Sequence, residues 1–242
     1  MKLQTQRAID RWLGQFLCAL VSAWVGLTQR GAATLPAHPR HIVVILLSEM
    51  GSIVLAGPMF AQLRRRFPSA HIHVLQLQKN QEVARLLALT DAARLHTLDD
   101  SSGLRLLRDI VLFSWRMRRL VVDAVVDCEL FSRISSLLSF ASGAPVRVGF
   151  TPHTQEGLYR GSFIHHSIPY NPYQHISKQF LSLVDALSDS GAPRNKPAPI
   201  RAVPLETELS VDISAGERDT YRAQLHKDHP ATVGRRLVLL YA

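Results

Sequence analysis

The stretch His41–Leu77, HIVVILLSEMGSIVLAGPMFAQLRRRFPSAHIHVLQL, decides the fold of this chain. Its continuous apolar run over Ile42–Leu47 predicts a strand that is buried on both faces. A polar turn over 48–52 leads into a predicted helix over Ser52–Arg66, and a second strand is predicted over His71–Leu77. Strand, helix and strand in this order form the opening unit of a parallel α/β sheet.

Strand and helix patterns keep alternating after this unit. Further strands are predicted at Arg94–Leu98, Asp123–Asp127 and Val146–Phe150, and further helices at Gln81–Leu89, Leu104–Leu120, Phe131–Ser142, Gln174–Ser188 and Ala215–His226. A loop rich in glycine, histidine and proline is predicted between the strand that ends at Phe150 and the helix that begins at Gln174. The pattern therefore predicts an α/β fold: a Rossmann-like parallel sheet with flanking helices.

The composition is that of a globular, basic protein. Of 242 residues, 47% are hydrophobic and 19% are charged, and the net charge is +9. This excess favours anionic partners, but no helix-turn-helix, zinc-finger or RNA-binding strand pattern is present, so we predict no nucleic-acid partner. The two cysteines lack a CxxC neighbour, which fits a reducing compartment. His71 and His73 share one face of a strand but have no further ligands, so we predict no metal site.

The N-terminal 38 residues are predicted to be an apolar helix followed by a linker. The apolar stretch Trp12–Leu27 has basic residues on both sides. It is shorter than the roughly 20 residues that span a bilayer, and Gln29 and Arg30 occupy the region where a signal peptide would be cleaved. Two alternatives remain open: an interfacial helix that lies on a membrane, and a helix that packs on the domain.

The C-terminal end carries another apolar strand pattern. Residues Arg236–Tyr241, RLVLLY, predict a strand at which the sequence ends. We expect this strand to open a second α/β domain that is truncated here; the alternative is an edge strand of the first sheet. The predicted domains are 1–38 (apolar helix and linker), 39–205 (Rossmann-like domain) and 206–242 (linker helix and first strand of the second domain).

The turn after the first strand holds the candidate chemistry. It has no GxGxxG, GxxxxGK[ST] or GxSxG pattern, so nicotinamide, flavin, P-loop and esterase sites are not supported. What remains is one carboxylate, Glu49, with hydroxyls at a helix amino terminus. Glu49 is a candidate general base and Ser52 a candidate helix cap. The alternative for Glu49 is a solvated turn residue or the partner of a nearby arginine.

The same residues carry a resemblance to a known family. SEMGSIVLAGP at 48–58 and LRRRFP at 63–68 resemble the first motif of the glycosyltransferase family 9 heptosyltransferases, in which a Ser-x-x-Gly-Asp turn precedes an apolar helix and an Arg-Arg-x-Phe-Pro ending. The other matching segments, in chain order, are IDRWLG at 9–14, DAVVD at 123–127, Ser139–Gly143, RVGF at 147–150 and His175–Leu187. The resemblance rests on the order and spacing of these segments along the whole chain.

This resemblance implies a GT-B architecture, with two Rossmann-like domains across a cleft. The acceptor-side domain would be the one present here, and Ser48, Gly51, Ser52, Arg147 and His175 would bind the acceptor. A sugar nucleotide such as ADP-heptose would be the donor, and the inverting transfer would use no metal and no cofactor. The family's catalytic Asp after the turn glycine is Ser52 here, so the base role would pass to Glu49.

The leading functional prediction is therefore an inverting glycosyltransferase that acts on a lipopolysaccharide-type or other cell-envelope glycan. We expect it to be inactive as this chain alone and to lie at the cytoplasmic side of the inner membrane, attached peripherally to the anionic surface. The alternative is a non-catalytic, membrane-associated module that binds glycans or acts as a scaffold. Ser52, in place of the family's Asp, favours that alternative.

Overall fold

The computed structural model describes residues 13–28, 34–47, 49–130, 132–150, 159–188 and 213–236. The chain forms two compact units, Met1–Leu209 and Ser210–Ala242. The first unit contains the sheet and the candidate site.

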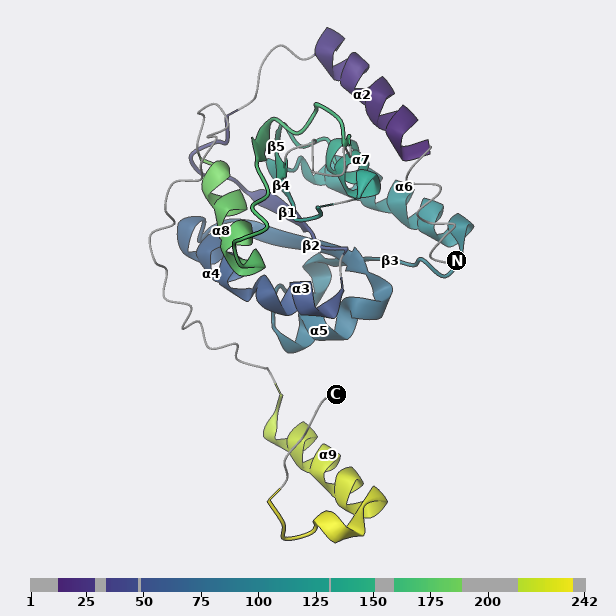
Figure 1. Cartoon of the computed structure of the whole chain (residues 1–242), viewed down its shortest axis with the longest axis vertical. Helices are drawn as coiled ribbons and strands as arrows, with labels where there is room; N and C mark the ends of the chain where they lie inside the picture. Colours follow the sequence, from purple (N-terminus) through teal and green to yellow (C-terminus); the bar gives the residue numbers. More distant parts are fainter. Residues whose placement is uncertain are drawn as a thin grey trace. The chain divides into compact units, whose positions relative to one another are not determined.

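Within the described part of the first unit, six strands form one sheet in the order β3-β2-β1-β4-β5-β6 (Figure 1). The strands are β1 (His41–Ile45), β2 (His71–Leu77), β3 (Leu95–Leu98), β4 (Ala124–Asp127), β5 (Val146–Phe150) and β6 (His166–Ile168). Every neighbouring pair is parallel, with Ile42 of β1 opposite Ile72 of β2 and Ala124 of β4. This is the doubly wound order, and it confirms the predicted α/β class.

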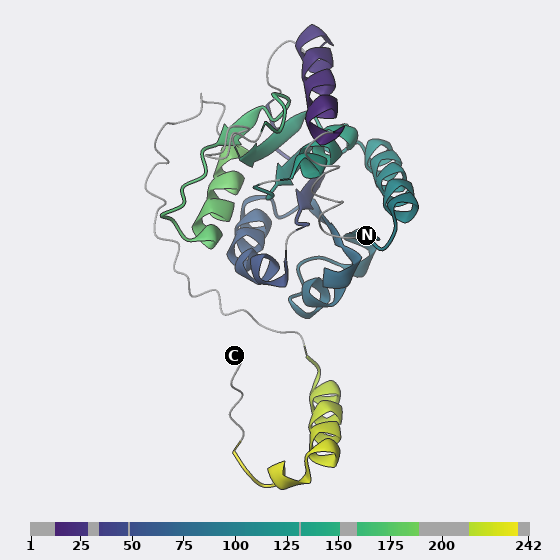
Figure 2. The ribbon, with the colours of Figure 1, turned by 45° about the vertical axis from the view of Figure 1, so that its right-hand side comes forward.

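Helices cover both faces of the sheet (Figures 1 and 2). The helices of the first unit are α2 (Gln15–Thr28), α3 (Met50–Leu55), α4 (Gly57–Arg66), α5 (Gln81–Leu86), α6 (Gly103–Leu120), α7 (Arg133–Ala141) and α8 (Ile176–Ala186). Short 3₁₀ turns lie at Gln78–Asn80 and Ala92–Arg94. Helices α3, α4, α5 and α8 pack in the core on one face, and α6 and α7 pack on the other. Each inner strand is therefore buried on both sides, which explains its unbroken apolar sequence.

The helix predicted over Ser52–Arg66 is in fact two helices, α3 and α4, that meet at Ala56. Pro58 lies in the first turn of α4. A proline ring inside a continuous helix would collide with the carbonyl four residues earlier and would remove one hydrogen bond. The chain therefore begins a new helix at Gly57.

Strand β6 lies in the region that was predicted to be a loop. It is a three-residue strand at the sheet edge, with Val148 opposite His166 and Phe150 opposite Ile168. Three residues are too few to show a recognisable period in the sequence.

Helix α2 packs on α7 and on the segment before β6. Its Cys18 and Val25 are buried against Phe163 and Ile164. The Ser22 hydroxyl accepts hydrogen bonds from the Tyr159 hydroxyl (2.8 Å) and from the Ser162 amide (3.0 Å). One face of the predicted N-terminal helix thus contacts the domain, as in the second of the two alternatives; residues 1–12 and 29–33 lie outside the described ranges.

No helix in the described ranges has the length and apolar character needed to cross a membrane.

The described part of the second unit contains helix α9 (Ala215–Asp228) and a 3₁₀ turn at Pro230–Thr232. The α9 helix begins with a capping box, in which the Ser214 hydroxyl accepts from the Glu217 amide and the Glu217 carboxylate accepts from the Ser214 amide. The strand predicted at Arg236–Tyr241 lies outside the described residues, except for its first residue.

Candidate functional site

The strand order places a topological switch point between β1 and β4. The helices after β1 pack on one face of the sheet, and α7, which follows β4, packs on the other. Open α/β sheets bind ligands outside the carboxyl ends of the two strands at such a point. We call this region, made of residues 47 and 49–52 after β1 and residues 128–130 and 132–133 after β4, the switch-point edge.

The predicted turn residues lie at this edge. Glu49 is the N-cap residue of α3, in an extended conformation, and its exposed side chain makes no cap hydrogen bond. Its carbonyl accepts from the Ser52 amide at 3.0 Å, so the turn is closed by its backbone. The predicted cap role of Ser52 is wrong, because α3 begins at Met50 and Ser52 is half-buried in its first turn. Gly51 is exposed, and Ser48 lies outside the described residues.

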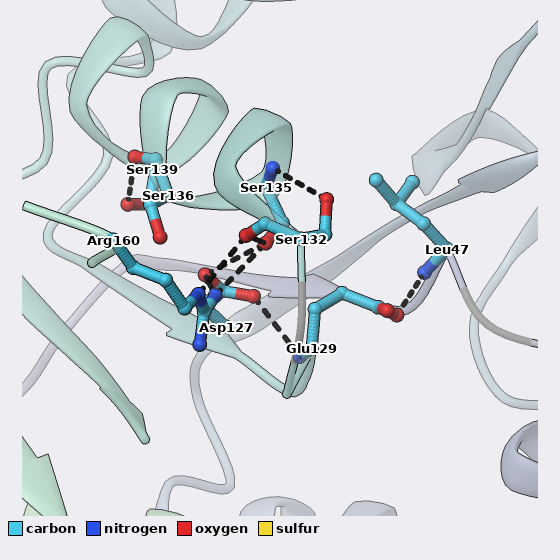
Figure 3. A network of polar contacts seen from close by, with 8 residues as sticks. All are labelled: Leu47, Asp127, Glu129, Ser132, Ser135, Ser136, Ser139 and Arg160. Atoms are coloured by element: carbon cyan, nitrogen blue, oxygen red, sulfur yellow. Dashed lines mark hydrogen bonds and ion pairs between the residues drawn. The ribbon is translucent and has the colours of Figure 1, made fainter. Parts of the chain in front are cut away.

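A second carboxylate, Glu129, lies at the same edge and was missed by the sequence analysis. It follows β4, is only 8% exposed, and its Oε1 accepts a hydrogen bond from the Leu47 amide at 2.7 Å. Glu129 therefore joins the end of β4 to the end of β1 immediately before the Glu49 turn (Figure 3). Glu129 could have been found from the doubly wound strand order, because that order makes β1 and β4 neighbours and brings their carboxyl ends together.

Beside Glu129, a buried ion pair between Asp127 and Arg160 holds the end of β4 in place (Figure 3). Asp127, the last residue of β4, pairs with Arg160, and both side chains are at most 1% exposed. Asp127 Oδ2 also accepts from the Ser135 hydroxyl at 3.0 Å, and its Oδ1 accepts from the Glu129 amide at 3.0 Å. Burial raises the pKa of Asp127, and Arg160 and these two donors oppose that rise. The pair ties the segment before β6 to β4 and α7.

Arg147 and His175, also predicted to bind the acceptor, lie in β5 and at the start of α8. Arg147 is 2% exposed in β5, and its guanidinium donates to the carbonyls of Phe163 (2.7 Å) and Ala144 (2.6 Å) and lies 3.1 Å from His165 Nε2. Burial lowers its pKa to about 10, so it stays protonated at neutral pH. Its donors are used inside the fold, so Arg147 exposes no group that reaches an acceptor.

His175 is the exposed N-cap residue of α8, where its Nδ1 accepts from the Ser177 amide at 3.4 Å. Its side chain thus takes part in starting that helix.

Four histidines gather on the α6 side of the sheet, at the amino ends of its first strands. His73 lies between His41 and His96, with both nitrogen–nitrogen distances at 3.1 Å, and the His41 and His71 rings are in contact. Both ring nitrogens of His73 therefore face another imidazole, and His96 Nδ1 lies 3.5 Å from a guanidinium nitrogen of Arg116. Among the described residues, no group of three or more His, Cys, Asp or Glu side chains is arranged to hold a metal ion.

Comparisons with known proteins identify the fold. No protein-family model matches the sequence, and no curated protein matches it. The structure is similar to the glycosyl transferase family 9 from Veillonella parvula, with a TM-score of 0.59 and 17% identity over 83% of this chain and 52% of that one. It is also similar to the ADP-heptose lipopolysaccharide heptosyltransferase II of E. coli, with a TM-score of 0.57 and 15% identity over 76% and 50% of the two chains.

A third similar structure is the E. coli heptosyltransferase WaaC with ADP-2-deoxy-2-fluoro heptose, with a TM-score of 0.51 and 15% identity over 64% of this chain and 50% of that chain. The chain therefore spans about half the length of each of these proteins. At these identities the likeness establishes the fold, and at that level the resemblance to family 9 glycosyltransferases is confirmed.

Proposed function

We propose that this chain is the acceptor-side domain of an inverting, sugar-nucleotide-dependent glycosyltransferase. The observation that carries the proposal is a doubly wound sheet with two carboxylates, Glu49 and Glu129, at its switch-point edge. The similarity in fold to three glycosyltransferases supports it. We propose a heptose as the donor sugar, supplied as its ADP derivative, and an envelope glycolipid or glycan as the acceptor.

In the reaction we propose, an acceptor hydroxyl attacks the anomeric carbon of the donor sugar. The new carbon–oxygen bond forms as the bond to the nucleoside diphosphate breaks, and the diphosphate leaves with that electron pair. A base takes the acceptor proton, and the developing charge on the sugar resembles that in glycoside hydrolysis. The donor-binding residues would belong to a second domain, because both substrates must be held together.

The geometry favours different roles for the two carboxylates. The Glu49 side chain is exposed on the turn, as a base that meets an incoming hydroxyl must be. Glu129 is nearly buried, and it accepts from the backbone just before that turn. We therefore propose Glu49 as the base and Glu129 as a positioning residue that holds the turn.

The test uses the longest natural product of the gene, with release of nucleoside diphosphate from ADP-heptose as the readout. We expect Glu49→Gln to lower kcat by about 10²-fold or more, in the range of general-base removal, with little change in acceptor binding. A matched control is Glu82→Gln, an exposed glutamate on α5, which should keep full activity. Retained turnover in Glu49→Gln, with loss in Ser52→Ala, would show that Glu49 is the wrong residue.

Glu129 is tested by replacement with alanine, which removes the acceptor for the Leu47 amide. We expect kcat to fall while the pH profile of the reaction keeps its shape, because Glu49 still supplies the base. Glu129→Gln keeps an oxygen that accepts this hydrogen bond and should rescue most of the activity. If Glu129→Gln instead abolishes the pH dependence of kcat, Glu129 is the base.

A second candidate function is a non-catalytic, glycan-binding module. It is favoured by Ser52, because a serine cannot serve as a base unaided at neutral pH. This candidate predicts that the longest natural product binds an inner-core glycan without sugar transfer. We also expect the chain of 242 residues alone to show no transfer. Robust turnover by this chain would overturn the two-domain proposal.

A further inference from the structure

Helix α6 is apolar on both sides. Its inner side contributes buried Phe113 and Met117 to the core, with Leu106, Ile110 and Leu120 packed against them. Its outer side carries five large apolar side chains that are each more than half exposed: Leu104, Leu107, Val111, Leu112 and Trp115. A helix on the surface of a soluble domain normally turns polar residues outward. The outer side of α6 therefore fits a contact with another molecule.

Arginines share this outer side with the apolar residues. Leu104, Leu107, Val111 and Trp115 follow one another at intervals of three and four residues, which places them in one stripe along the helix. Arg105, Arg108, Arg116 and Arg119 are all exposed beside it. Arg119 stacks on the Trp115 ring at 4.1 Å. The acidic residue of α6, Asp109, is largely buried and is paired with Arg108.

Helix α2 adds a second apolar stripe on the same side of the sheet. Its outward residues Phe16, Leu20, Trp24 and Leu27, with Leu13 just before the helix, are each at least half exposed and follow at intervals of three and four residues. Helix α2 contacts α7, and α7 covers the same face of the sheet as α6. Figures 1 and 2 both show α2 next to α7. We call the outward sides of α6 and α2 together the apolar–basic face.

We propose that the apolar–basic face binds the surface of an anionic lipid bilayer, with α6 as a contact helix in its own right. Leucine and tryptophan side chains enter the interfacial region, and the arginines meet lipid phosphates. Asp99 and Asp109 pair with Arg105 and Arg108. A second copy of the same face would bring Arg116 and Arg119 against the same two arginines, and an apolar protein partner would have to bury both of these charges. The proposal does not depend on the proposed sugar transfer.

The test uses the chain of 242 residues and vesicles of phosphatidylcholine, alone or with about one third phosphatidylglycerol. We expect co-sedimentation with the anionic vesicles, weakened by salt. Replacing Leu107, Val111 and Trp115 together with glutamine should reduce vesicle partitioning by at least about tenfold. Glutamine is a good helix former and these positions are exposed, so the fold should remain intact. Circular dichroism and thermal melting verify this.

Two matched controls test whether binding is specific to the apolar–basic face. One removes apolar side chains elsewhere, and the other removes positive charge elsewhere. Tyr173→Gln with Leu86→Gln removes exposed apolar side chains elsewhere in the unit and should leave vesicle binding unchanged. Arg116→Gln with Arg119→Gln should weaken binding to anionic vesicles by about fivefold for each arginine. The same number of arginines removed from the opposite side of the sheet, by Arg65→Gln with Arg85→Gln, should have a clearly smaller effect.

A direct readout comes from Trp115 as the sole tryptophan, in a variant with Trp12→Phe and Trp24→Phe. Its emission should shift to the blue on addition of anionic vesicles, because the ring leaves water. Vesicle binding without this shift would mean that α2 acts alone, and it would overturn the role of α6. The proposal would also be overturned if the chain did not bind vesicles but formed a dimer, and if the glutamine variant of α6 were monomeric. A second copy would then cover the face.

Discussion

Acidification should destabilise this fold through its histidine ladder. His73 is 5% exposed on β2, and its two ring nitrogens lie 3.1 Å from His41 Nδ1 and from His96 Nε2. Burial, together with the neighbouring His96 and His41, lowers the pKa of His73 to about 3. Burial and Arg116 lower the pKa of His96 to about 4. As the pH falls below about 6.5, histidines of the unfolded chain become protonated, whereas His73 and His96 stay neutral in the folded protein.

The size of the effect follows from these values. The pKa of an unfolded histidine is near 6.5. Each unit of difference between the folded and the unfolded pKa corresponds to about 1.36 kcal/mol in the free energy of unfolding. The folded state binds fewer protons, so stability is complete above about pH 6.5 and is lost as the pH falls towards the folded pKa. At about pH 5, each of the two residues should have lost roughly 2 kcal/mol, about 4 kcal/mol together. Domains of this size are stable by about 5–15 kcal/mol, so the loss should be large.

The assay is urea denaturation at about pH 7.5 and about pH 5, followed by circular dichroism. His73→Gln cannot be protonated, so its loss of stability between the two pH values should be about 2 kcal/mol smaller than that of the wild type. His38→Gln, at an exposed position of the linker, is the matched control and should behave as wild type. An equal pH dependence in the wild type and in His73→Gln would refute the argument that the ladder must stay neutral.

Three further changes should affect stability or reactivity. Arg160→Met leaves Asp127 buried without its countercharge, and we expect a loss of about 3–5 kcal/mol in urea denaturation. Gly161→Ala should lower the melting temperature, since Gly161 has a φ of +90° and a Cβ there would collide with the Phe163 ring; Gly51→Ala, with open space around it, should not. Burial raises the pKa of the Cys128 thiol, so a thiol reagent should modify it only when urea unfolds the chain.

Local periodicity was enough to predict five of the six described strands, including the edge strand β3, but not the edge strand β6. The helix predicted over Leu104–Leu120 differs from α6 by a single residue, because the Ser102 hydroxyl caps its start and a left-handed residue, Val121, ends it. The break at Ala56 was missed because the apolar pattern continues through Pro58, although the proline itself was a sufficient signal. Strand β6 depends on pairing with β5, and a three-residue sequence cannot encode that by itself.

The candidate site shows the same division between local and long-range information. Glu49 could be found from the sequence because the strand, the turn and the helix around it are contiguous. Glu129 lies 82 positions away from the amide it binds, at Leu47, and becomes visible only when β1 and β4 are placed side by side. Arg147 was predicted to bind the acceptor because RVGF at 147–150 resembles a segment of the family 9 heptosyltransferases. In the fold, backbone carbonyls satisfy its donors in the interior.

The turn can be compared with the family pattern that the sequence resembles. Residue 52, where the family has its Asp, is in the first turn of α3, and Glu49 is the N-cap residue three positions earlier. The Ser52 amide donates to the Glu49 carbonyl at 3.0 Å, so the two residues close one turn. A glutamate has one methylene more than an aspartate and extends further from its backbone. We therefore propose that the carboxylate lies three positions earlier in the same turn and still serves the same acceptor, with Glu129 fixing the backbone from which Glu49 extends.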